Sequence, residues 1–426
     1  MAEKAELRRA VGRWDLAALA VNGVIGTAIF GLPATAAQLT GAWSLLACAL
    51  CAVVVLFFVL CFAEASSLFT TTGGPYVYVR EAFGDTLALA AGWMTWLARV
   101  TAFAANSNLF ASYLAFFVPS LGRGAGRAAI LVGVTAGLTV LNVRGVRPGA
   151  LLGDFLAAVK LIPMFAFVAV GLSAVRGELF DFSFHPSYRD FGAAVLLYVF
   201  AFTGFEFAAI PAGEAKSPKK HLPAAMLSAL AVAAVLYTGI QSVCVGTLPG
   251  LVHSQTAMAD AAALFVGPVG GAIIAVTALV SMLGNLSAMM LVAPRLTFAL
   301  AGDRLLPGPL AAVHPRYRTP HVSILVYGAL TLALALSGTF VGMVRISSLA
   351  RVFPYALTFA GLPVLRRKCP VDENLFRLRG GWTIPVISLA LCVWLLSQST
   401  MQDLAAGAAA LACGYALMWI TARPGK

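Results

Sequence analysis

Apolar residues fill most of this chain in long runs, separated by short stretches rich in Gly, Pro, Lys and Arg. The runs approach the roughly 20 residues that an α-helix needs to cross a bilayer. They predict an all-α polytopic membrane protein with twelve transmembrane helices. The predicted spans cover residues 16–40, 42–68, 86–118, 127–143, 150–175, 190–213, 223–248, 268–300, 320–338, 341–366, 382–397 and 404–422.

The first apolar run is interrupted in its middle by the sequence Gly-Val-Ile-Gly-Thr-Ala, residues 23–28. In hydrocarbon, backbone groups that lose their helical hydrogen bonds are costly, so a break requires protein, water or a ligand to satisfy them. A second interruption, at residues 203–207, lies about 180 residues later in the sixth run. Matched interruptions in two halves of a chain are typical of a transporter's substrate site.

The spacing of the two broken spans predicts an internal repeat. Five spans separate their starts, and because five is odd, the second unit enters the membrane from the opposite side, as in an inverted-topology 5+5 repeat. We assign residues 16–175 to the first repeat and 190–366 to the second, with broken helices 1 and 6. Residues 382–422 hold helices 11 and 12, and residues 1–15 and 423–426 are tails. The Ala-rich residues 256–265 predict a short external helix, acting either as a lid or as a plain connector.

Composition and charge agree with this interpretation. Hydrophobic residues make up 60% of the chain and charged residues 11%, with a mean hydropathy of +0.90, outside the range of soluble domains. A net charge of +12 would suit a nucleic-acid partner, but twenty of the 29 Lys and Arg residues lie in the tails and even-numbered loops. This positive-inside pattern argues against nucleic acid and predicts an inner (cell) membrane protein with both termini in the cytoplasm.

Cysteine and histidine give no sign of a metal, a cofactor or an enzyme site. Six of the seven cysteines lie inside predicted spans, Cys369 lies in a loop, and the five histidines lack ligand spacing. We therefore expect no catalytic residue, no metal and no cofactor.

Three stretches, taken together, resemble the amino acid/polyamine/organocation (APC) transporters. They are the first break with residues 29–33 (Ile-Phe-Gly-Leu-Pro), the run Gly-Gly-Pro-Tyr-Val-Tyr at residues 73–78 ending at Gly84, and Gly-Phe-Glu at residues 204–206 followed by residues 214–223. The resemblance implies the inverted-repeat fold first described for the leucine transporter, and an amino acid permease. The family commonly has Gly-Ser-Gly in the first break. Here Ala28 adds a methyl group where a ligand would approach the backbone most closely.

The two breaks supply the candidate substrate-binding residues. A helix start presents free N–H groups and a positive dipole end, whereas helix ends present free carbonyls, so together they suit the two charges of an α-amino acid. The resemblance implies a carboxylate at Gly26, Thr27 and Ala28 and an amino group at the carbonyls of Val24, Phe200 and Thr203. Ile25 and Gly204 complete the breaks, and Asn285 and Met289, one turn apart in span 8, are expected to face the site. The alternative is that Gly23 and Gly26 serve only close helix packing.

Ionisable residues inside predicted spans supply the coupling candidates. Lys160 lies ten residues into span 5, and a charge at that depth indicates function. The resemblance to sodium-independent members implies that its ammonium group replaces a sodium ion near Gly23 and loses a proton during the cycle. The alternative is a permanently charged lysine that tethers spans 1 and 5. Glu206 is a proton relay, a partner of freed amide groups or a contact between helices.

Several remaining residues have weaker assignments. Phe200 is the candidate gate, with Phe202 and Phe205 as neighbours, against the alternative that these rings only pack. Arg99 and Arg351 match no motif and are expected to pair structurally or to face water. Glu64, at the cytoplasmic end of span 2, is expected to be solvated.

The sequence therefore predicts a secondary active transporter for amino acids that works by alternating access in the lipid bilayer. It is predicted to be sodium-independent, proton-coupled, and a monomer or homodimer. The alternatives are an amino acid exchanger, a polyamine or organic-cation carrier, and a membrane sensor or channel that keeps the fold without turnover.

Overall fold

The computed structural model describes residues 12–69, 74–145, 149–206, 216–368, 375–378 and 380–422, without the side chains of residues 15, 19, 149–159 and 421–422. These described residues form helices and loops and contain no strand. The α-helices are α1 (Arg13–Val24), α2 (Ala28–Thr40), α3 (Ser44–Leu68), α4 (Pro75–Phe83), α5 (Asp85–Ala115), α6 (Gly124–Arg144), α7 (Gly149–Ser173), α8 (Tyr188–Phe202), α9 (Pro218–Thr247), α10 (Ala257–Phe265), α11 (Pro268–Gly302), α12 (His321–Ser337), α13 (Phe340–Lys368), α14 (Thr383–Ser397) and α15 (Met401–Ala422). Short 3-10 helices are η1 (Gly41–Trp43), η2 (Pro119–Gly122), η3 (Gly177–Leu179), η6 (Leu251–His253) and η7 (Gly308–Ala311).

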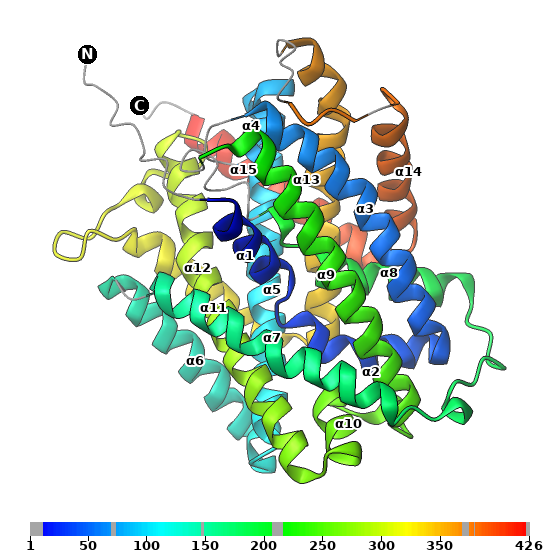
Figure 1. Ribbon diagram of the computed structural model, residues 1–426. Helices are drawn as coiled ribbons and strands as arrows, with labels where there is room; N and C mark the ends of the chain where they lie inside the picture. Colours follow the sequence, from blue (N-terminus) through cyan, green and yellow to red (C-terminus); the bar gives the residue numbers. More distant parts are fainter. Residues whose placement is uncertain are drawn as a thin grey trace.

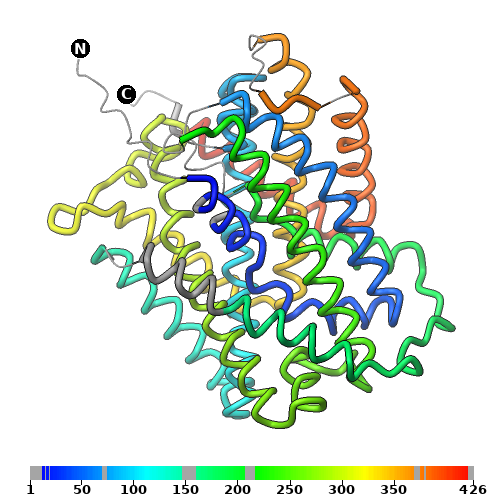
Figure 2. The backbone as a smooth tube through the Cα atoms, viewed as in Figure 1, coloured from blue at the N-terminus to red at the C-terminus, as the bar shows by residue number. Residues whose placement is uncertain are grey.

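The helices form one bundle in which α5 and α13 pack extensively on each other, as do α3 and α9 (Figure 1). α1 packs on α9, and α2 continues at an angle to α1 and packs on α8. The start of α1, the end of α15 and the short α4 lie at one end of the bundle, and α10 lies at the opposite end. The segment between α11 and α12 projects from the bundle, and the chain between α1 and α2 leaves the helical path (Figure 2).

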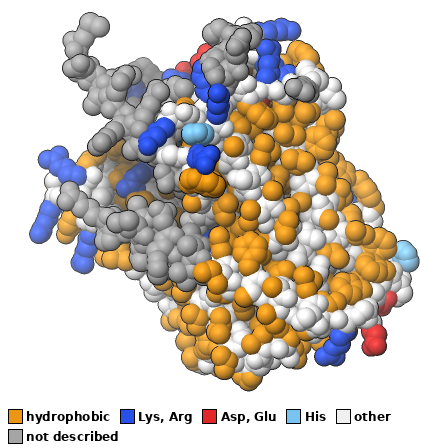
Figure 3. All heavy atoms as spheres, viewed as in Figure 1, with side chains coloured by type: hydrophobic (Ala, Val, Ile, Leu, Met, Phe, Trp, Pro, Cys, Tyr) orange, Lys and Arg blue, Asp and Glu red, His pale blue; other side chains and the backbone are white. Residues whose placement is uncertain are grey.

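The outer surface of the bundle is apolar, as expected for a protein that contacts lipid. Large apolar side chains are exposed on most of the long helices, for example Ile162, which is 73% exposed, and Val53, which is 51% exposed. In Figure 3 the apolar side chains cover a broad face, and Lys and Arg side chains gather toward the end that carries α4. Among the described residues, seven helical segments are long and apolar enough to cross a membrane, and α12, α14 and the second half of α7 form shorter apolar helices.

Ten of the twelve predicted spans each coincide with one helix, within a few residues at its ends, whereas span 1 divides into α1 and α2, and in span 6 the helix α8 ends at Phe202. The break in span 1 is confirmed, since α1 ends at Val24 and α2 begins at Ala28. The helix expected at residues 256–265 is confirmed as α10. Residues 207–213 of span 6 lie outside the described residues, as do Gly73, residues 214–215, Cys369 and most of the two predicted tails. Whether twelve segments cross the membrane stays a prediction.

The expectation that Glu64 is solvated is wrong. Its side chain is 1% exposed and holds Arg366 of α13 through two contacts, Nε to Oε1 at 2.6 Å and Nη2 to Oε2 at 2.7 Å. The Leu378 amide donates a further hydrogen bond of 3.2 Å to Oε2. The segment that follows α13 therefore covers this carboxylate, and the sequence position at a helix end did not indicate that cover. Pro354 and Pro363 lie inside α13 on the N-terminal side of Arg366, and neither residue has a backbone N–H to donate to the helix.

Candidate functional site

The first break consists of the three residues between α1 and α2, residues 25–27, where the regular helical hydrogen bonding of the backbone is interrupted. Ile25 donates to Val21 O at 2.8 Å and Gly26 donates to Val24 O at 2.8 Å, after which regular helical bonding stops. Thr27 precedes α2 and provides no side-chain cap to it. The start of α2 therefore presents backbone N–H groups without a helical partner, together with the positive end of the helix dipole. Thr27 is only 2% exposed, and Ala28 is 5% exposed.

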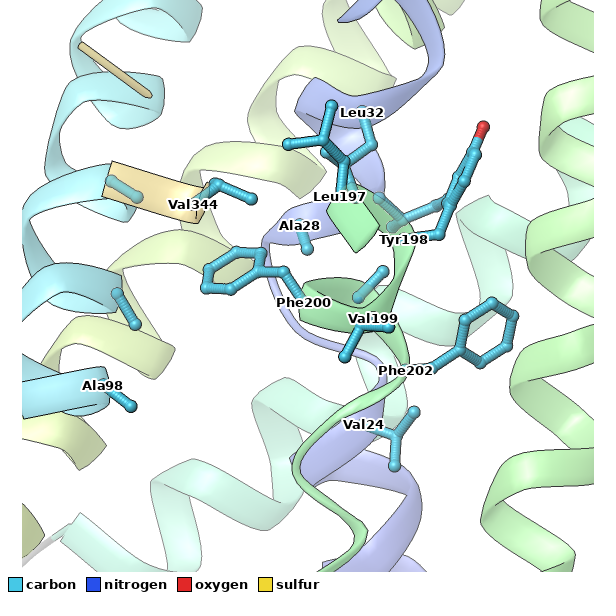
Figure 4. Packing of buried hydrophobic residues seen from close by; sticks show 14 of the residues in the cluster. Val24, Ala28, Leu32, Ala98, Leu197, Tyr198, Val199, Phe200, Phe202 and Val344 are labelled. Carbon is cyan, nitrogen blue, oxygen red and sulfur yellow. The ribbon is translucent and has the colours of Figure 1, made fainter. Parts of the chain in front are cut away.

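The second break lies directly against the first. α8 ends at Phe202, Thr203 is extended, and Gly204 has φ +114°, a conformation that L side chains rarely adopt. A Cβ atom on Gly204 would lie closer than 3.0 Å to the Gly23 carbonyl oxygen. Only glycine allows this approach, so the two interrupted helices contact each other backbone to backbone. Figure 4 shows the residues around Val24 and Ala28 lying beside the end of α8.

Tyr237 of α9 joins the two breaks. Its buried hydroxyl donates to Val24 O at 2.8 Å and lies 3.4 Å from Ala201 O. Val24 O therefore already has a partner, and Phe200 O accepts a hydrogen bond of 2.9 Å from the Thr203 hydroxyl. Two of the three carbonyls expected to receive an amino group are thus shared with the protein itself. Nothing in the local sequence around Tyr237 indicated this contact.

Lys160 of α7 reaches the first break. Its Nζ donates to the Ile25 carbonyl oxygen and, at 2.7 Å, to the side-chain oxygen of Asn22. The lysine is 5% exposed. The two polar contacts of its ammonium group are thus one carbonyl of the break and one neutral side chain. The Lys160 ammonium group therefore occupies a carbonyl oxygen of the break that could otherwise bind a metal cation. Its part in coupling stays a prediction.

Glu206 is bound from two sides. Its Oε2 accepts a hydrogen bond of 2.9 Å from the Gly204 amide, and its Oε1 lies 3.6 Å from Nη1 of Arg351. The same Nη1 donates to the Thr203 hydroxyl at 2.7 Å. Arg351, on α13, therefore binds both sides of the second break. Arg351 was expected either to pair structurally or to face water, and the structure shows the pairing, with Glu206. The sequence did not connect Arg351 with the site.

Phe200 and the polar residues of α5 and α11 border the breaks on one side. In Figure 4 the Phe200 ring points from α8 toward α5 and Val344, whereas Phe202 points away, toward α9. Phe202 packs on Tyr237 with ring centroids 5.1 Å apart, and Phe205 packs on Phe62 at 5.4 Å. Phe202 and Phe205 therefore pack on aromatic rings of other helices, whereas the Phe200 ring lies 5.8 Å from the guanidinium carbon of Arg351. Its role as a gate stays a prediction.

Asn285 and Met289 of α11 meet Asn106 of α5 next to the first break. The Asn106 amide donates to Asn285 Oδ1 at 2.9 Å and lies 3.8 Å from the Met289 sulfur. A Cβ on Gly26 would lie 3.4 Å from Asn285 Nδ2. The Asn106 side-chain oxygen is buried and has no hydrogen-bond partner among the described residues. An acceptor without a partner beside the break is available to a ligand's donor.

The described residues at the breaks are buried in this conformation. Phe200 is 6% exposed, Met289 is 7% exposed and Thr203 is 4% exposed. A cavity of about 540 Å³ opens at the α10 end of α5, lined by Ser112, Ala115, Phe116, Pro119, Gly122, Arg123, Gln255 and Thr256. Within the described part of the chain, no group of three or more His, Cys, Asp or Glu residues is placed to hold a metal ion.

Comparison with known proteins gives a consistent picture. The family model described as amino acid permease matches residues 11–420. The methylthioribose transporter of Bacillus subtilis is 30% identical, over 92% of this chain and 88% of its own length. The serine/threonine exchanger of the same organism is 26% identical, over 97% and 94%, and its branched-chain amino acid permease is 26% identical, over 92% and 88%.

These matches extend over nearly the whole chain and include both breaks. The family is a family of transporters, and the apolar helices agree with a multi-pass membrane protein. The chain belongs to the amino acid permease family of the APC superfamily.

Proposed function

We propose that this protein is a secondary active permease that carries amino acids across the cytoplasmic membrane by alternating access. The observation that carries the proposal is the contact between the two breaks, with free N–H groups at the start of α2 and carbonyls at the ends of α1 and α8. An α-carboxylate binds the amides of Thr27 and Ala28, because a helix start attracts an anion. The α-ammonium group binds on the carbonyl side, where the Thr203 carbonyl supplements the shared oxygens of Val24 and Phe200.

Alternating access follows from the burial of this site. Residues at both breaks are almost fully buried, so the substrate enters and leaves only when helices move apart on one side at a time. The proposed scaffold is the inverted repeat of residues 16–175 and 190–366, within twelve spans and with both termini in the cytoplasm. The start of α1 and the end of α15 at one end of the bundle support an even number of crossings.

The proposed energetic mode is sodium-independent. The Lys160 ammonium group binds Ile25 O and Asn22, and it supplies at the break the positive charge that a sodium ion would bring. A lysine desolvated to this degree can release a proton during the cycle, which supports proton symport. Exchange of one amino acid for another is the second candidate, since a relative of the chain is a serine/threonine exchanger.

Two other candidates have less support. A polyamine or organic-cation carrier is opposed by Arg351, because a second cation beside a buried guanidinium group is repelled. A thiosugar carrier is suggested by the methylthioribose transporter alone, and a neutral sugar would leave the free amides of α2 without an anionic partner.

Uptake into proteoliposomes tests the proposal. The purified protein is given a panel of labelled amino acids, with spermidine and methylthioribose as the competing classes. Each solute is assayed with and without an inward proton gradient, a sodium gradient, and internal amino acid. We expect amino acid uptake that does not depend on sodium and that increases with a proton gradient or with internal amino acid. Uptake of spermidine or methylthioribose without any amino acid would overturn the proposal.

A further inference from the structure

A polar stripe on α13 faces the site from the side of Phe200. Ser348, Arg351 and Tyr355 are spaced three and four residues apart and therefore lie on one face of the helix. All three are buried, at 0%, 7% and 2% exposed. α13 packs on α5 and α8, and Ser347 binds Ala98 O of α5 at 2.8 Å. The stripe thus lies between the helices that border the breaks, where polar side chains are costly unless they bind something.

Part of this stripe lacks partners among the described residues. Arg351 uses Nη1 for Thr203 and Glu206, but its Nε is buried and has no hydrogen-bond partner there. The Ser348 hydroxyl is likewise buried and has no hydrogen-bond partner among the described residues. Burying such donors without partners costs free energy, so a ligand that accepts from them is favoured. Both are donors, and a guanidinium group binds carboxylates in particular.

The charges around the site point the same way. Arg99 of α5 is 7% exposed and has Glu206 and Arg351 as electrostatic neighbours. The guanidinium groups of Arg99 and Arg351 therefore lie near each other on the side of the site where Arg351 has an unused donor. A carboxylate placed there is attracted to both groups, whereas a second ammonium group is repelled.

From these observations we infer that the site selects amino acids with an anionic side chain, and that Arg351 receives the side-chain carboxylate. The inference rests on the proposed function, because the α-groups must bind at the two breaks. A side chain that starts at the breaks extends past the Phe200 ring, whose centroid is 5.8 Å from the Arg351 guanidinium carbon. Arg351 then contacts the substrate directly, and Arg99 adds to the positive potential. The cargoes named for the relatives differ from one another and do not fix this specificity.

The test compares glutamate with glutamine, which have nearly the same shape and differ in side-chain charge. Binding to the purified protein is measured by ligand-induced thermal stabilisation, and transport by proteoliposome uptake, with leucine and lysine as further probes. For the wild type we expect a preference for glutamate over glutamine of at least about tenfold, and no binding of lysine. Arg351→Gln should bring the two ligands close to parity, and Arg351→Lys should keep part of the preference.

Arg345→Gln is the matched control, because it makes the same change on α13 at a half-buried arginine that forms no ion pair with another described residue. It should leave the preference for glutamate unchanged. A wild type that prefers glutamine overturns the inference, and so does an Arg351→Gln variant that loses both ligands equally, since Arg351 would then serve the α-carboxylate or the fold. If Arg351→Gln does not fold, the wild-type ratio and the lysine variant decide. If no amino acid binds or moves in the wild type, the proposed function itself fails.

Discussion

Replacing Gly204 with alanine is expected to separate the two breaks. Gly204 has φ +114°, and holding an L-residue in such a conformation costs of order 1–3 kcal/mol. The new methyl group would also overlap the Gly23 carbonyl oxygen, and overpacking of this kind costs about 1–3 kcal/mol. Together the two effects predict a loss of about 4 kcal/mol for the closed arrangement.

The loss is measured as a lower apparent melting temperature in detergent and as slower uptake in proteoliposomes. Gly137→Ala is the control, since a Cβ atom at this helical position of α6 meets nothing within 4 Å. Alanine is favoured over glycine in a helix by about 1 kcal/mol, so the control should be as stable as the wild type or more stable. If Gly204→Ala melts with the control and transports at the wild-type rate, the close backbone contact is not needed, and the reasoning is refuted.

Three further substitutions test other contacts. Lys160→Ala removes the charge at the break and should abolish gradient-driven uptake while leaving a folded protein on size exclusion; unchanged uptake would remove Lys160 from the mechanism. Tyr237→Phe deletes the donor to Val24 O and should cost about 1–2 kcal/mol, measured by thermal unfolding, with an unchanged melting temperature counting against the bridge. Glu64→Gln leaves the guanidinium group of Arg366 without its carboxylate and should lower the free energy of unfolding by about 3 kcal/mol. Arg366→Met in the Glu64→Gln protein should recover part of that loss. Equal stability of Glu64→Gln and wild type would mean that the ion pair contributes nothing.

The sequence predicted the helices well because in a membrane protein the length of an apolar run nearly determines a helix. It also predicted the first break, since Gly23 and Gly26 lie in the middle of an apolar run that would otherwise form one continuous helix. Such signals are local in the sequence, so they can be recognised without knowing which helices are neighbours in the fold. Lys160 was identified for the same reason, as a charge deep within an apolar run.

Contacts between distant helices could not be predicted in the same way. Tyr237 looks like any aromatic residue of a membrane helix, and only the fold brings its hydroxyl to Val24 O. Arg351 was noticed as an intramembrane charge, but its partners lie about 150 residues earlier in the chain. Glu64 was misjudged because the segment at residues 375–378 covers it, and the end of a helix usually lies in water.

The two prolines of α13 have a mechanical consequence. Pro354 and Pro363 lie between Arg351, which binds the second break, and Arg366, which is clamped to Glu64. Each proline removes an amide donor from the helix and so weakens its resistance to bending. α13 is therefore easier to bend between Arg351 and Arg366 than a helix without prolines. The ion pair with Glu64 of α3 and the ion pair with Glu206, just after α8, hold the two sides of this weak point to different helices.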